Sequence, residues 1–162
     1  MNTAYLLTGG NIGNRKQNLE HAANALSKEA GNIMALSGIY ETAAWGKTDQ
    51  PSFFNQCIGI ETMLSAMELL HIIMAIEKRM GRLRDEKYGP RIIDIDILLY
   101  NNDIIDEPSL QIPHPRLADR RFALAPLAEI AARVMHPVFK KTISELLLEC
   151  RDMLPVKKLD NC

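Results

Sequence analysis

The sequence predicts an α+β fold in which helices cover an antiparallel sheet, with further helices added at the C-terminal end. Four apolar stretches are typical of strands, and two apolar stripes at helical spacing lie between them, in the order β-α-β-β-α-β. The length of 162 residues, with 47% hydrophobic and 24% charged residues, fits a single domain over 1–162 that buries a core.

Three strands are expected in the first part of the chain, over residues 5–8, 33–41 and 53–62. After the first of them, Asn14 resembles a helix N-cap with Gln17 three positions later, and apolar residues at helical spacing follow until Gly31. The connection over 42–51 is too long for a simple hairpin turn. It is therefore a candidate for function.

The second part begins with a capping box, Ser65 and Glu68, and a helix whose apolar stripe ends at Gly81. A polar and basic connection, 82–90, leads to a strand over 92–100. Prolines are expected to keep much of the following stretch irregular, with short helices at 121–132 and 142–150. This order matches the ferredoxin-like split βαβ plan, a sandwich with helices mostly on one face of the sheet and loops around a ligand on the other.

Composition excludes several classes of protein. The formal net charge of −1 gives no general attraction to nucleic acid or to an anionic membrane. Three cysteines with no metal-ligand spacing favour a reducing compartment. Because no apolar run approaches the roughly 20 residues of a membrane span, and no signal peptide is recognisable, we expect a cytoplasmic protein that acts as a monomer.

Asp94 and Asp96 alternate with isoleucines along one predicted strand. Residues two apart on a strand share a face, so both carboxylates point the same way and need a compensating charge. Mg²⁺ held by carboxylate oxygens supplies this charge and keeps water and phosphates as its other ligands. Because short motifs match by chance, surface acids bonded to nearby arginines are the favoured alternative for the D-x-D pattern alone.

The basic setting strengthens the functional interpretation. Arg82, Arg84 and Arg91 precede the two acids. A guanidinium group binds phosphate bidentately, through two parallel hydrogen bonds. Carboxylates for a metal and arginines for phosphates are the two halves of a nucleoside-triphosphate site. His114 lies between prolines and before more arginines, so phosphate contact and packing are equal alternatives. Glu77 could contribute to the site or simply be solvated. No P-loop or Rossmann glycine motif is present.

Residues 87–98, with Gly89-Pro90-Arg91 before Asp94 and Asp96, resemble the long motif of the 6-hydroxymethyl-7,8-dihydropterin pyrophosphokinases of folate biosynthesis. The resemblance covers nearly the whole chain. The other matching positions are Gly9-Gly10-Asn11, Tyr40-Glu41-Thr42, Gly46, Asp49-Gln50-Pro51, Phe53, Asn55, Glu77, Gly81-Arg82-Leu83-Arg84, Pro113-His114-Pro115 and Arg120-Arg121-Phe122.

The resemblance implies that the pterin hydroxymethyl oxygen attacks the β-phosphorus of the co-substrate ATP, which transfers diphosphate and releases AMP. It implies that Asp94 and Asp96 hold two Mg²⁺ ions. The catalytic residues it implies are Arg82, Arg91, Asp94 and Asp96. For ATP it implies Glu77, Arg82, Arg84, Arg91, His114 and Arg120, and for the pterin Thr42, Ala43, Ala44, Trp45, Phe53, Asn55, Asp94 and Phe122.

Four positions depart from the family's pattern. Ala43-Ala44 replaces a pair that commonly contains proline, Phe53 takes a place often held by tyrosine, Tyr88 stands where several members carry tryptophan, and Gly10 replaces the usual serine. None of these changes removes an implied metal ligand or an essential positive charge.

Two rival interpretations remain open. Another D-x-D metal-dependent nucleotide transferase, such as a nucleotide-sugar transferase, predicts a longer chain. A non-enzymatic ferredoxin-like module for a nucleotide or RNA predicts exposed aromatic residues and a basic charge balance. The 6% aromatic content and the charge of −1 fit the RNA-binding module poorly.

Overall fold

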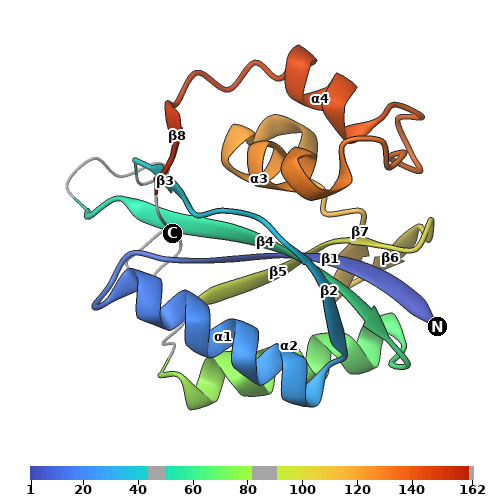
Figure 1. Ribbon diagram of the computed structural model, residues 1–162. Helices are drawn as coiled ribbons and strands as arrows, with labels where there is room; N and C mark the ends of the chain where they lie inside the picture. Colours follow the sequence, from blue (N-terminus) through green and yellow to red (C-terminus); the bar gives the residue numbers. More distant parts are fainter. Residues whose placement is uncertain (44–49, 82–90, 161–162) are drawn as a thin grey trace.

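The computed structural model describes residues 1–43, 50–81 and 91–160. Its centre is an antiparallel sheet with helices on both faces (Figure 1). The larger elements are β1 (Asn2–Gly10), α1 (Arg15–Glu29), β2 (Asn32–Leu36), β3 (Tyr40–Thr42), β4 (Phe53–Thr62), α2 (Ala66–Arg79), β5 (Asp94–Tyr100), β6 (Ile105–Glu107), β7 (Leu110–Ile112), α3 (Arg121–Ala131), α4 (Ile143–Glu149) and β8 (Val156–Lys158).

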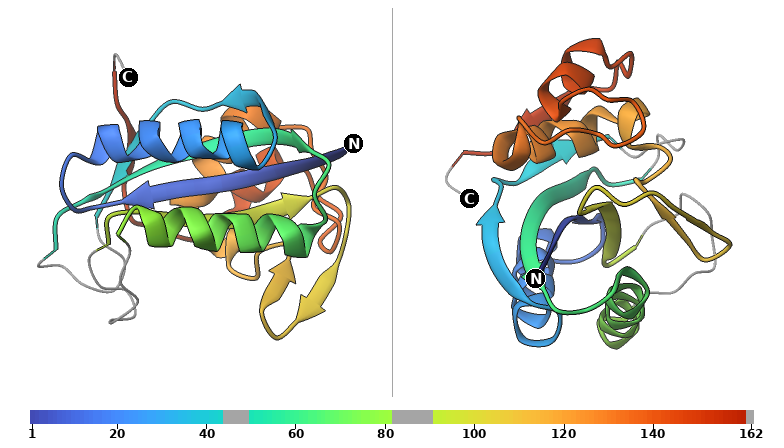
Figure 2. Two further views of the ribbon diagram at one scale, coloured as in Figure 1. Left: turned by 90° about the horizontal axis from the view of Figure 1, so that it is seen from below. Right: turned by 90° about the vertical axis from the view of Figure 1, so that its right-hand side faces the viewer.

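The strand order of the main sheet confirms the ferredoxin-like plan. The order is β5-β1-β4-β3-β8, with β2 also paired to β4, and every pairing is antiparallel. Helices α1 and α2 run side by side across one face, as both views in Figure 2 show. The opposite face was expected to be left to loops around a ligand. Instead α3 and α4 cover part of it and bury a second apolar cluster there.

Capping explains where the main helices begin. The Asn14 side chain accepts a hydrogen bond from the backbone N–H of Gln17, as its N-cap position predicts. Ser65 and Glu68 form a complete capping box at the start of α2. Gly31 follows the end of α1 and allows close packing, because a Cβ there would lie 2.2 Å from the carbonyl oxygen of Glu61.

The strand expected over 33–41 is broken into β2 and β3, and Ser37 is the cause. Its hydroxyl oxygen accepts a hydrogen bond from the backbone N–H of Cys57 at 2.9 Å, and its carbonyl accepts one from the Gln56 amide at 2.8 Å. A side chain therefore replaces one link of the backbone ladder. On either side of this break, β2 pairs with the C-terminal half of β4 and β3 with the N-terminal half.

Other boundaries also differ from expectation. The first strand is longer than 5–8, and the strand expected from residue 92 begins at Asp94. The proline-containing stretch is less irregular than expected, because β6 and β7 form a hairpin and Pro126 lies inside α3 without ending it. β8 was not expected, since Val156 is followed by two exposed lysines and shows no apolar alternation.

The strand that carries Asp94 and Asp96, β5, is held by apolar clusters on both faces of the sheet. Ile93, Ile95 and Ile97 are buried against the α1–α2 side, as the alternation predicts. Leu98 and Leu99 join the cluster under α3 and α4. Within 1–43, 50–81 and 91–160, no helix is both long enough and apolar enough to span a membrane.

Candidate active site

A cavity opens on the α3 side of the sheet, where five elements and the residues next to them meet. It is lined by Leu7, Gly9, Thr42, Ala43, Phe53, Asn55, Arg91, Asp94, Asp96, Arg120 and Phe122. The structure therefore brings together the six described residues that the resemblance assigns to the pterin, along with three residues assigned to ATP or metal. Their binding roles remain predictions.

The register of the sheet explains why residues far apart in sequence meet here. Gly9 on β1 is paired with Asn55 on one side and with Asp94 on the other. A Cβ at Gly9 would lie 2.1 Å from the Asn55 amide oxygen, so the missing side chain leaves room for that amide. Thr42 is paired with Phe53 across the next strand boundary. The cavity floor is thus built from adjacent positions on four strands.

The two acids lie on the cavity wall, and Asp94 is paired with Arg91. An Nη atom of Arg91 lies 2.9 Å from an Asp94 carboxylate oxygen, and both side chains are largely buried. The alternative considered for the D-x-D pattern, an acid paired with a nearby arginine, therefore holds for Asp94 in this structure. Asp96 lies two residues further along β5 and lines the same cavity.

Asn11 fixes Arg91 next to the cavity. It is 2% exposed, its backbone N–H donates to the Arg91 carbonyl at 3.0 Å, and its side-chain oxygen accepts from the Arg91 N–H at 2.9 Å. Its amide nitrogen donates to Gln50 and to the Pro51 carbonyl, each at 3.1 Å. The sequence marked Asn11 only through a family resemblance, since none of these distant contacts has a local signal.

Two arginines lie near the aromatic rings of the cavity. The guanidinium carbon of Arg91 is 5.4 Å from the ring centre of Phe53. That of Arg120 is 5.5 Å from the ring centre of Phe122. Both distances are within the range of cation–π attraction, so positive charge is held beside flat apolar surfaces. The same cavity can therefore receive an aromatic ring and an anionic group.

A second hollow adjoins the first along β5. It is lined by Leu70, Ile95, Asp96, Ile97, Pro108, Ser109, Leu110, Gln111, His114 and Pro115. Asp96 is a lining residue of both hollows. The sequence did not indicate Leu70 or the β6–β7 hairpin as lining residues, because nothing local shows that they meet β5.

His114 is neutral at pH 7. Burial lowers its pKa to about 4, with a further lowering by the Arg120 charge that the Asp94 charge opposes only in part. Its Nδ1 accepts a hydrogen bond from the backbone N–H of Arg116 at 3.1 Å. The proton of the neutral ring therefore sits on Nε2, which makes His114 a hydrogen-bond donor without a charge.

Glu77 lines neither hollow among the described residues. It is 2% exposed, so the interpretation of it as a solvated side chain is wrong. One carboxylate oxygen accepts a hydrogen bond from the backbone N–H of Ile95 at 2.8 Å. Since β5 is at the edge of the sheet, Glu77 takes the place of a missing neighbouring strand between the two aspartates.

Several predicted site residues lie outside the described ranges. They are Ala44, Trp45, Arg82 and Arg84, together with Tyr88, one of the four departures from the family's pattern.

The fold and the site define a ferredoxin-like domain whose cavity combines carboxylates, guanidinium groups and aromatic rings. A model of the 7,8-dihydro-6-hydroxymethylpterin-pyrophosphokinase (HPPK) family matches residues 5–132. The chain belongs to this family.

Curated relatives agree with the family match. A 2-amino-4-hydroxy-6-hydroxymethyldihydropteridine pyrophosphokinase of Bacillus subtilis is 43% identical over 82% of this chain and 80% of the relative. An enzyme of the same name from Aquifex aeolicus is 41% identical over 90% of each chain. These relatives are similar to this chain over most of their own length.

Solved structures show the same fold. Plasmodium falciparum HPPK-DHPS with pterin and p-hydroxybenzoate superposes with a TM-score of 0.77 at 21% identity. The match covers 91% of this chain and 43% of that longer chain, so this chain spans less than half of it. At this identity the similarity supports the fold alone.

Proposed function

We propose that this chain transfers diphosphate from ATP to the hydroxymethyl group of 6-hydroxymethyl-7,8-dihydropterin, giving AMP and the pterin diphosphate in folate biosynthesis. Family membership and the enzyme name of the relatives support this reaction. The observation that carries it is that Asp96 lines two hollows, one of them also lined by residues assigned to the pterin and the other by His114.

The first hollow suits a flat heterocycle with hydrogen-bonding edges. Phe53 and Phe122 offer ring faces, and such faces pack well against planar aromatic ligands. Thr42 and Asn55 line the cavity and are only 4% and 5% exposed, so their polar groups are shielded from bulk solvent. An amide carries both donors and an acceptor, which lets Asn55 read the edge of a pterin.

Asp94 and Asp96 are the residues that would hold Mg²⁺, and we propose two ions as the resemblance implies. The fit is chemical: both side chains offer the hard oxygen donors that Mg²⁺ prefers, and both line the cavity. When bound, the ions supply positive charge that offsets the charge of the triphosphate. The Arg91 guanidinium, which pairs with one Asp94 oxygen, has further N–H groups that would bind a phosphate oxygen.

The remaining groups would hold the phosphates. The Arg91 and Arg120 guanidinium groups lie at the cavity, and neutral His114 can donate from Nε2. The hydroxymethyl oxygen forms a bond to the β-phosphorus and loses its proton to solvent, the bond from that phosphorus to the α–β bridging oxygen breaks, and AMP leaves with that oxygen. Charge on the transferred group is stabilised by positioned cations rather than by a covalent intermediate. Arg82, Arg84 and Glu77 are assigned to ATP by resemblance alone.

The two rival functions are not favoured by the comparisons. Neither a nucleotide-sugar transferase nor an RNA-binding module explains a family match over residues 5–132.

The reaction is tested by measuring AMP and pterin diphosphate from ATP and Mg²⁺, with and without 6-hydroxymethyl-7,8-dihydropterin. We expect the two products in equal amounts, and neither when the pterin or the metal is omitted. Formation of ADP in place of AMP, or no reaction with the pterin, would contradict the proposal. A nucleotide-sugar transferase would release nucleoside diphosphate from a sugar nucleotide, and a binding module would consume no ATP.

A further inference from the structure

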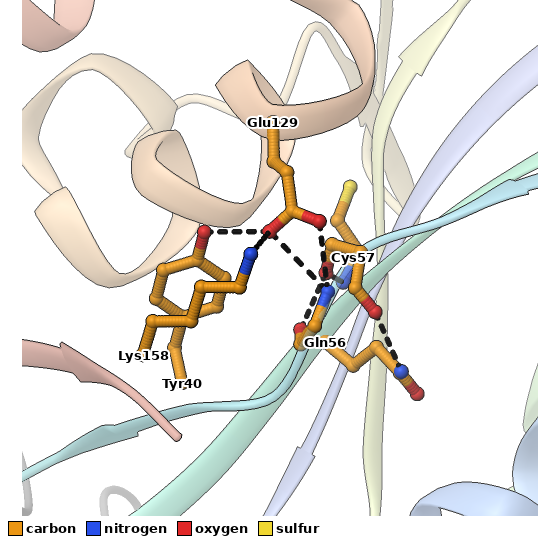
Figure 3. Close-up of polar contacts among 7 residues, drawn as sticks. Tyr40, Gln56, Cys57, Glu129 and Lys158 are labelled. Carbon is orange, nitrogen blue, oxygen red and sulfur yellow. Dashed lines mark hydrogen bonds and ion pairs between the residues drawn. The ribbon is translucent and has the colours of Figure 1, made fainter. Parts of the chain in front are cut away.

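A polar cluster outside the cavity joins α3 to the edge of the sheet. The Glu129 carboxylate accepts hydrogen bonds from the Tyr40 hydroxyl at 2.7 Å and from the Gly38 N–H at 3.1 and 3.3 Å. The Lys158 ammonium lies 3.2 Å from the same carboxylate. Figure 3 shows Tyr40 and Lys158 reaching Glu129, which extends from a helix. We call these four residues the Glu129 cluster.

The charges of the cluster suit these contacts. Burial raises the pKa of Glu129, but the hydrogen bonds from Tyr40 and Gly38 and the charge of Lys158 outweigh it, so the pKa lies below its ordinary value. Burial and the neighbouring carboxylate raise the pKa of Tyr40. At neutral pH the carboxylate is therefore charged and the phenol keeps its proton, so a charge-assisted hydrogen bond joins them.

The two elements that meet in the Glu129 cluster also form opposite parts of the cavity. Tyr40 and Thr42 are two residues apart on β3, and positions with this spacing share a face of a strand. Glu129 and Phe122 are seven residues apart on α3, two helical turns or about 10 Å along one helix face. Thr42 and Phe122 both line the cavity. The cluster thus joins the same strand and the same helix that contribute Thr42 and Phe122 to the cavity.

The sheet register extends this connection to Asn55. Asn55 is paired with Tyr40 on β3, and Tyr40 is paired with Lys158 on β8. One row across the sheet therefore runs from the cavity floor to the Glu129 cluster. The Lys158 side chain also packs closely on Gly38, because a Cβ at Gly38 would lie 2.7 Å from the Cε atom of Lys158.

We propose that Glu129 is a positioning residue for pterin binding, which fixes β3 against α3 and so sets the spacing of Thr42, Asn55 and Phe122. This inference rests on the proposed function, since it takes the cavity as the pterin site. β8 lies beyond residues 5–132, so its Lys158 adds a contact from outside the span of the family match.

The test is steady-state kinetics of the full chain with two variants and a matched control. Glu129→Gln removes the charge but keeps the side-chain length, and Tyr40→Phe removes only the hydroxyl. Glu149→Gln neutralises an exposed glutamate paired with Lys141 on the surface of α4, away from the cavity. We expect each cluster variant to raise KM for the pterin about fivefold or more, with KM for ATP and kcat within about twofold of wild type.

The outcomes separate this inference from the proposed function. If the wild-type chain forms no AMP, the proposed function itself fails and takes the inference with it. If wild type is active but both cluster variants keep the wild-type KM for the pterin, Glu129 is not a positioning residue. An equal rise in KM for both substrates also overturns the inference, because it indicates general loosening. If Glu129→Gln does not fold, as judged by thermal melting, Tyr40→Phe decides alone.

Discussion

Replacing Glu77 by leucine should destabilise the protein because it removes the acceptor of a buried backbone N–H. In the wild-type chain the buried carboxylate accepts a hydrogen bond from the Ile95 N–H at 2.8 Å, and Ile95 is 5% exposed. Leucine has a similar volume and suits the apolar face of α2, but it offers no acceptor. The Ile95 N–H then stays buried without this partner at the edge of β5.

The expected cost follows from that loss. Leaving a buried donor unsatisfied costs about 1–3 kcal/mol. For a chain of this size each kcal/mol shifts the melting temperature by roughly 2–4 °C, so a decrease of roughly 2–12 °C is expected. Glu77→Gln keeps an oxygen acceptor and should be the more stable of the two variants. The distinction depends on the acceptor rather than on the volume of the side chain.

Urea denaturation and amide hydrogen exchange measure this effect. We expect a lower denaturation midpoint at an unchanged slope for Glu77→Leu, with faster exchange at Ile95 than at the sheet interior. If Glu77→Leu is as stable as wild type within about 0.5 kcal/mol, the reasoning is wrong, because then the N–H needs no acceptor. It is equally wrong if Glu77→Gln proves less stable than Glu77→Leu.

Three other substitutions test the site. Asp96→Ala should lower AMP formation by at least about 10²–10³-fold with an unchanged melting temperature, and near-normal turnover in Mg²⁺ would refute its metal role. His114 has a folded pKa of about 4 and an ordinary value of 6.5, so the unfolded chain binds its proton first as pH falls. The folding stability that neutral His114 contributes is therefore lost as the pH falls from 6.5 to about 4. In His114→Gln, the free energy of unfolding measured in urea should depend less on pH over this range. If the dependence on pH is the same as in wild type, the lowered pKa of His114 is contradicted. Gly10→Ser restores the family's usual residue, but a Cβ there would lie 2.2 Å from the Ile92 carbonyl oxygen. We expect the variant to lose about 1–3 kcal/mol of folding stability, and its kcat to fall because Arg91 is displaced. If the variant is as stable as wild type in urea unfolding, the backbone at Ile92 moves aside without cost and the reasoning is wrong.

Local sequence patterns predicted the parts of the fold that depend on local physics. The alternation around Asp94 and Asp96 correctly placed both carboxylates on one face, because a strand has a period of two. The capping signals at Asn14 and Ser65 correctly marked helix starts, since an N-cap and its partner are only three residues apart. The ferredoxin-like order followed from these elements.

The features that were missed depend on contacts between distant residues. Ser37 breaks a strand by bonding to Cys57, and Asn11 joins Arg91 across 80 residues of sequence. Glu77 was ambiguous because the residue that decides its burial, Ile95, lies on another element. No periodicity reports which distant backbone group a polar side chain will meet. The residues assigned to the pterin could therefore be anticipated only through resemblance to a family, while the contacts that support the cavity required the structure.

The short strand β8 has a consequence for the behaviour of the folded protein toward other copies of itself. Without it, β3 would present unpaired backbone groups that could template the addition of a foreign strand. With it, the part of this edge that β3 forms ends in three residues, two of them the exposed lysines Lys157 and Lys158, while β2 forms the rest of the edge. Short, positively charged edges are a common protection against edge-to-edge aggregation. The strand that supports the Glu129 cluster therefore also helps to keep β3 from pairing with a strand of another chain.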